Sequence, residues 1–165
     1  MKQLGMLLLG MLLASLAGAC WYLLRVEWLK ADLLLPLVVY LAVAPREQGP
    51  GLVVEVFLLG LVADNLGGTT PGMHALSYLV IWLLLSRWRS LLAFDSPPTR
   101  VLLVAGASLG CQLLHLLLIL ASAAGGNLYR VQLWALVPVA VLSGLLALPT
   151  WPLAAKAWPA REARP

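Results

Sequence analysis

The residues of this chain that could take part in proton transfer or binding lie in or beside strongly apolar segments. Asp64 ends one apolar run and His74 begins the next, while Gln112 and His115 lie within a later run. Their spacing of three residues places Gln112 and His115 on one face of a helix. Carboxylates and imidazoles are general acids and bases, and polar groups inside membrane segments often mark proton or substrate pathways. These four residues are therefore the first candidates for chemistry.

Other features of the sequence argue against catalysis. No pair of carboxylates and no Ser–His or Cys–His arrangement shares a polar setting, and no phosphate-binding motif is present. Cys20 and Cys111 lie in apolar runs at no metal-ligand spacing. For Gln112 and His115, a small proton relay is one interpretation, and a hydrogen bond between helices is the simpler one. We therefore expect no enzyme activity, no metal site and no cofactor.

The composition indicates the medium in which these residues lie. Of the 165 residues, 62% are hydrophobic and 11% are charged, and the mean hydropathy is +0.93. A soluble domain has about a quarter of its residues charged, so this chain has too little polar surface to cover a core in water. We expect one membrane domain over residues 1–165. The basic residues serve as topology determinants, which excludes a nucleic-acid partner.

The apolar runs predict an all-α, polytopic integral membrane protein with about six transmembrane helices. A helix needs roughly 20 residues to cross the hydrocarbon core. The first, fifth and sixth runs have that length, and the shorter second to fourth runs leave open whether they cross fully. The predicted spans are 3–24, 31–44, 51–66, 72–86, 101–124 and 131–155.

The distribution of basic residues agrees with six spans and cytoplasmic termini. Eight of the 11 Lys and Arg residues then lie inside and three outside, as the positive-inside rule requires. The inner ones are Lys2, Arg46, Arg87, Arg89, Arg100, Lys156, Arg161 and Arg164, and the outer ones are Arg25, Lys30 and Arg130. Glu55, near the inner start of the third span, is expected to reach water or to pair with Arg46.

The N-terminal run also admits a different interpretation. Lys2, the apolar run and the small residues 17–19 resemble a signal peptide, with Cys20 as a lipoprotein junction. However, the apolar run continues past the cleavage point to Leu24. We therefore expect the first helix to be retained.

Small residues recur at four-residue intervals in three of the predicted spans. Gly10, Ala14 and Gly18 form such a face on the first helix, and the fifth and sixth spans repeat the spacing at 106/110 and 140/144. Small residues let membrane helices approach closely. The face on the first helix could pack within the protein or dock another membrane protein.

Asp64 opens a turn between the third and fourth spans. A carboxylate at a helix C-terminus meets the negative end of the helix dipole, so Asp64 needs partners elsewhere, and the unpaired amides from Gly72 to His74 are the nearest. Gly67 and Gly68 permit positive φ, and Pro71 fixes φ where a helix begins. Gly60 allows a close backbone neighbour. The segment predicts a structural turn, and a ligand contact by Asp64 is the alternative.

These residues resemble the signature of MreD, the rod shape-determining membrane protein family. The resemblance covers the whole chain, with its length, its hydrophobic N-terminal helix and its short loops. Asn65 and the Thr69-Thr70 pair depart from the pattern but leave the turn intact. The residues that carry the resemblance are Gly60, Asp64, Gly67, Gly68, Pro71, Gly72, His74, Ala75 and Leu76.

The resemblance implies a non-catalytic scaffold in the bacterial cytoplasmic membrane. Such a protein binds the bitopic protein MreC and, through it, the glycosyltransferase RodA, a class B penicillin-binding transpeptidase and the actin-like MreB filament. Its role would be to control cell shape and side-wall peptidoglycan synthesis. The family is also similar in architecture to the substrate-binding S-components of energy-coupling-factor vitamin transporters. An S-component-like subunit is therefore the alternative function, and it would require polar groups that converge on an outward cavity.

Overall fold

The computed structural model describes residues 32–44, 50–67, 71–91, 96–121 and 128–157, and these residues form helices joined by turns. The predicted first span, with Gly10, Ala14 and Gly18, lies outside the described residues. Within them the all-α prediction is confirmed. The helices are α2 (Leu35–Val43), α3 (Pro50–Gly67), α4 (Met73–Arg87), the 3-10 helix η2 (Arg89–Leu91), α5 (Pro97–Ala121) and α6 (Leu128–Ala157).

Helices α3 to α6 coincide with the predicted spans 51–66, 72–86, 101–124 and 131–155, with shifts of a few residues at their ends. The second predicted span differs more. Helix α2 has nine residues instead of the 14 of the apolar run 31–44. It ends at Val43, and the next residue, Ala44, has a non-helical ψ of 136°, because the following Pro45 disfavours a helical conformation of the residue before it.

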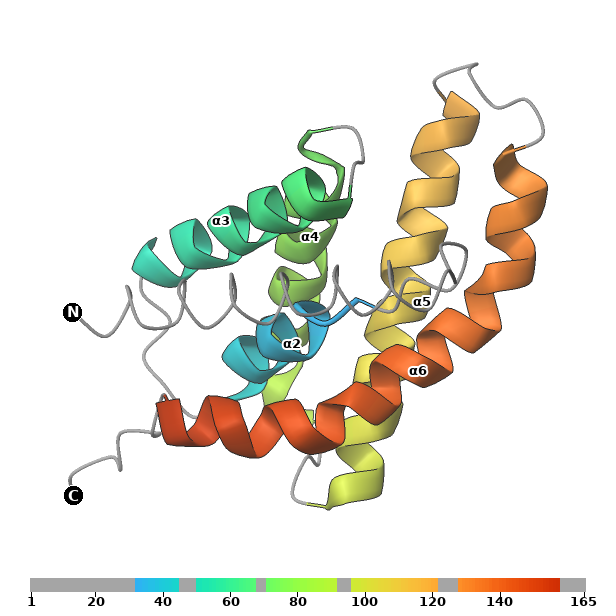
Figure 1. The fold of residues 1–165 in the computed structure, drawn as a ribbon. Helices are drawn as coiled ribbons and strands as arrows, with labels where there is room; N and C mark the ends of the chain where they lie inside the picture. Colours follow the sequence, from blue (N-terminus) through green and yellow to red (C-terminus); the bar gives the residue numbers. More distant parts are fainter. Residues whose placement is uncertain (1–31, 45–49, 68–70, 92–95, 122–127, 158–165) are drawn as a thin grey trace, which may run out of the picture.

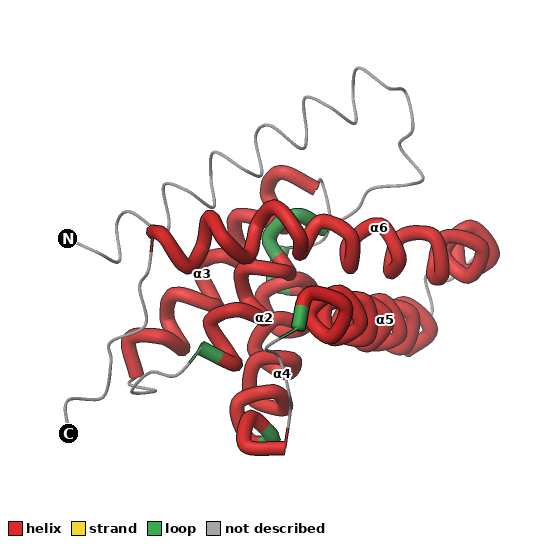
Figure 2. The backbone as a smooth tube through the Cα atoms, turned by 90° about the horizontal axis from the view of Figure 1, so that it is seen from below, coloured by secondary structure: helices red, strands yellow, loops and turns green. Residues whose placement is uncertain are grey.

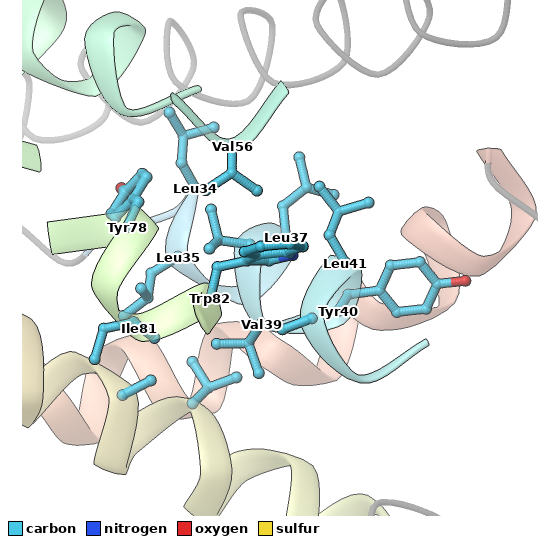
Figure 3. Close-up of a cluster of buried hydrophobic side chains, with 14 of the residues drawn as sticks. Leu34, Leu35, Leu37, Val39, Tyr40, Leu41, Val56, Tyr78, Ile81 and Trp82 are labelled. Atoms are coloured by element: carbon cyan, nitrogen blue, oxygen red, sulfur yellow. The ribbon is translucent and has the colours of Figure 1, made fainter. Parts of the chain in front are cut away.

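Helix α2 is a core element. At 1.5 Å per residue it is about 14 Å long, roughly half the thickness of the hydrocarbon core. All nine of its residues are buried, and the other helices enclose it (Figures 1 and 2). Val56 of α3 and Tyr78, Ile81 and Trp82 of α4 contribute to the same apolar cluster (Figure 3). The uninterrupted apolar sequence of α2 therefore reflects burial on every side.

Within the described residues, helices α5 and α6 contain the two segments that are long and apolar enough to cross a membrane, Pro97–Leu118 and Leu133–Lys156. Only 28% and 39% of the residues in these segments are buried within the protein. Their large apolar side chains point outward, as with Leu102 at 70% and Trp134 at 86% exposure. Helix α4 is a shorter apolar helix, Met73–Arg87.

The long helix α6 packs along α5 and bends strongly (Figure 1). Three prolines lie within it, at positions 138, 149 and 152, and each removes a backbone hydrogen bond and favours a kink. Gly144 permits the close approach to α5, because a Cβ there would lie 2.8 Å from the carbonyl oxygen of Val101. The small residue at 144 therefore serves packing within the protein.

Candidate functional site

Asp64 links the end of α3 to the beginning of α4. Its carboxylate accepts a hydrogen bond of 2.7 Å from the N–H of Gly72 and one of 2.9 Å from the N–H of His74. These are amides at the start of α4, so the capping expected from the sequence is confirmed. Asp64 is 2% exposed, which makes these bonds necessary, since a buried carboxylate without donors is strongly destabilising.

The turn contains a left-handed residue at a position that the sequence did not single out for positive φ. Among the described residues, the glycine with positive φ is Gly72, at 96°, while Gly67 is the last residue of α3 and Gly68 lies outside the described residues. Gly72 is the N-cap of α4, and the exposed Pro71 precedes it instead of opening the helix. Gly72 has this left-handed conformation while its N–H donates to Asp64. Position 72 is therefore where the turn requires a glycine.

Gly60 brings the two helices of the hairpin into direct backbone contact. A Cβ at position 60 would lie 2.3 Å from Cα and 2.6 Å from N of Ala75. Side chains in folded proteins do not approach a backbone so closely, and the backbone of α4 cannot yield as a flexible side chain would. The expectation that Gly60 admits a neighbouring backbone is confirmed, and that backbone belongs to α4.

His74 extends the site toward α5. Its Nδ1 lies 2.9 Å from Oδ1 of Asp64, and the carboxylate fixes the proton on that nitrogen. The His74 ring stands edge-on to the ring of His115, with centroids 4.6 Å apart and planes at 75°. The sequence indicated a local role for His74, and the fold adds a second histidine from a different helix.

Asp32 is a residue of this site that the sequence analysis did not single out. Its Oδ1 accepts from the N–H groups of Leu34 and Leu35 and so caps the start of α2. The hydroxyl of Tyr78 in α4 lies 2.6 Å from both carboxylate oxygens and donates to them. The Asp32 N–H donates to Oγ of Ser143 in α6. An Asp just before an apolar run is a helix-start signal, but nothing local indicates its bond to Tyr78.

Two further polar residues can now be placed. Gln112 donates from Nε2 to the carbonyl oxygen of Leu136 at 3.2 Å, so the expected hydrogen bond between helices is confirmed and joins α5 to α6. Glu55 was expected to reach water or to pair with Arg46. It is 5% exposed, so the first alternative is wrong, and Arg46 lies outside the described residues. It lies on the buried side of α3, next to the core residue Val56.

The basic residues gather away from Asp64 and His74, at the other ends of the helices. Arg89, just beyond α4, donates to the carbonyl oxygen of Ala44 at the end of α2. Arg100, near the start of α5, lies 5.3 Å over the ring of Trp151, which also contacts Tyr40 edge-on at 5.4 Å. The helix ends on this side therefore carry positive charge and aromatic side chains.

The site is thus a set of buried polar side chains that fastens α2, α3, α4, α5 and α6 to one another. Within the described residues, no group of three or more His, Cys, Asp or Glu side chains could hold a metal ion. Comparison with known proteins finds no matching family model, no matching curated protein and no matching solved structure. The function of the protein must therefore be inferred from its residues and their arrangement.

Proposed function

We propose that this chain is a non-catalytic membrane scaffold of the bacterial elongation machinery, similar to MreD. The observation that supports this proposal is the use of Asp64. Both oxygens of its carboxylate accept hydrogen bonds from the start of α4, so the acidic residue of the signature segment holds a turn together. A scaffold needs a fixed fold and apolar faces for its partners. A structural role for the signature segment is consistent with that need.

We propose that the protein crosses the cytoplasmic membrane about six times, with both termini in the cytoplasm. Support comes from the two ends of α4, which begins beside Asp64 and His74 and ends in Arg87, with Arg89 following. Arg89 and Arg100 would then lie on the cytoplasmic side, as the positive-inside rule requires. The exposed apolar side chains of α5 and α6 would face lipid.

In this proposal the partner is MreC, held through a small-residue face of a membrane helix. Indirect partners are the RodA glycosyltransferase, a class B penicillin-binding transpeptidase and MreB. The face formed by Gly10, Ala14 and Gly18 is the candidate for docking. In lipid the hydrophobic effect does not drive helices together, so they associate through the close packing that small residues allow. Gly144, by contrast, already packs against α5 and is not available to a partner helix.

A second candidate is a substrate-binding subunit similar to the S-components of vitamin transporters. One observation favours it. Asp64, His74, His115 and Tyr78 converge from three helices, whereas the sequence placed Asp64 and His74 in a turn and gave His115 a separate helix contact. Convergent polar groups are typical of a ligand site, although here they bond chiefly to one another.

The deciding experiment is purification of the tagged full chain from native membranes, followed by identification of co-purifying proteins and small molecules. The scaffold proposal expects an MreC-like protein, and it expects Ala14→Leu or Gly18→Leu to weaken its capture. Gly106→Leu is the matched control, because a Cβ at that exposed glycine meets nothing within 4 Å. Capture reduced only by Gly106→Leu would move the docking face to α5. A bound small molecule without MreC would favour the transporter subunit.

A further inference from the structure

The fold places the two histidines of this chain side by side. The sequence contains two His residues, one at the start of α4 and the other in the second half of α5. Their ring centroids lie 4.6 Å apart, and the rings meet edge to face. A positive charge on either imidazole ring therefore interacts electrostatically with the other ring.

The two rings differ in their surroundings. The His74 side chain is 19% exposed and is bonded to the carboxylate of Asp64. His115 is 8% exposed, and its Nε2 has no hydrogen-bond partner among the described residues. A buried ring nitrogen left in this way is costly.

The charges around the pair allow one additional proton but oppose two. The carboxylate of Asp64 lies 2.9 Å from Nδ1 of His74, so a single positive charge on the pair would have a negative charge beside it. Two imidazolium ions at this separation in a buried site would repel each other strongly. In α6 the ionisable group among the described side chains is Lys156, at the far end of the helix. The other ionisable groups around the pair are Asp64 of α3, Tyr78 of α4, Asp32 before α2 and Cys111 of α5.

We propose that His74 and His115 form a one-proton latch between the α3–α4 hairpin and α5. The latch stays closed while the pair holds no additional proton or one. It opens when both rings are protonated, because repulsion then acts directly across the contact between α4 and α5. The latch uses no partner, so it stands independently of the function proposed above.

The test uses the full-length protein in lipid nanodiscs with ¹⁵N-labelled histidine. Because the chain has two histidines, the imidazole signals report this pair alone. Across the pH range in which histidine titrates, we expect two steps of proton uptake whose affinities differ by more than about tenfold. The ¹⁵N chemical shifts of both imidazole rings should change in each step. Two independent single-step titrations in the wild-type protein would overturn the proposal without any variant.

Variants then test whether repulsion opens the contact. Cys111 lies one turn before His115 and is buried, so its modification by a thiol reagent in a Cys20→Ser background reports the opening of α5. Relative to unfolded protein at the same pH, we expect modification to rise at least tenfold when both rings are charged. His74→Gln should abolish this rise, and the control Gln112→Ala should retain it. A rise that persists in His74→Gln, or no rise in wild type, contradicts the latch.

Discussion

Gly60 of α3 lies directly against Ala75 of α4, and a Cβ at residue 60 would stand 2.3 Å from the Ala75 Cα. The hairpin that presents Asp64 to the start of α4 is possible only because position 60 has no side chain. Two structural demands thus meet in one segment, a close helix crossing and a carboxylate that caps the following helix.

Gly60→Ala is expected to destabilise the protein by about 1–3 kcal/mol, the usual cost of overpacking. The added methyl group must push apart two backbones, and no flexible side chain can absorb the strain. Thermal unfolding in detergent measures the effect. Gly106→Ala is the control, since its Cβ enters open space, and equal stability of the two variants would show that the hairpin is not as close as described.

Replacing Asp64 should lower stability in a defined order. Asp64→Ala leaves the amides of Gly72 and His74 without their acceptors, at a cost of about 1.5–3 kcal/mol for a hydrogen bond to a charged group. Asp64→Asn keeps one acceptor oxygen and should fall between Ala and the wild type. Denaturant unfolding in detergent gives the order. Asn65→Ala, at an exposed position, should have little effect, and an Asn65→Ala loss as large as that of Asp64→Ala would contradict the capping role.

The Tyr78–Asp32 hydrogen bond is expected to couple α4 to the start of α2. Tyr78→Phe removes the hydroxyl that lies 2.6 Å from the carboxylate, while Asp32 still caps α2. A double-mutant cycle with Asp32→Asn should give a coupling free energy of about 0.5–3 kcal/mol. Additive losses in the double variant would mean that the two side chains act separately.

Gln112→Leu should lower the free energy of unfolding only slightly, by about 0.6 kcal/mol. Hydrogen bonds between membrane helices average this value in double-mutant cycles. The interhelical bond lost here joins Gln112 to the carbonyl oxygen of Leu136, and the other, to Oγ of Ser108 at 3.4 Å, lies within α5. Unfolding in detergent, compared with the neighbouring exposed Leu113→Ala, provides the measurement. A loss of several kcal/mol would indicate that Gln112 belongs to the buried cluster of Asp64 and His74.

Much of the hairpin could be predicted because its signals are local. Gly60, Asp64 and Gly72 lie within about a dozen residues, and each has a specific backbone requirement: close approach, capping or positive φ. Positive φ was expected to be permitted at Gly67 and Gly68; Gly67 is instead the last residue of α3, Gly68 lies outside the described residues, and the left-handed residue is Gly72. Glycine permits positive φ without requiring it, so the local sequence could not select which glycine would adopt it.

For the residues that the structure describes, the sequence by itself determined that they are helical and apolar, where α3 to α6 lie, and that Asp64 caps the helix after it. These properties follow from periodicity, composition and contacts between near neighbours. Only the tertiary structure decided that α2 is a short buried helix, that Glu55 is enclosed, and that Asp32 meets Tyr78. It also decided that His74 meets His115. Such contacts join residues from different helices, and their partners depend on how those helices cross, which no local pattern specifies.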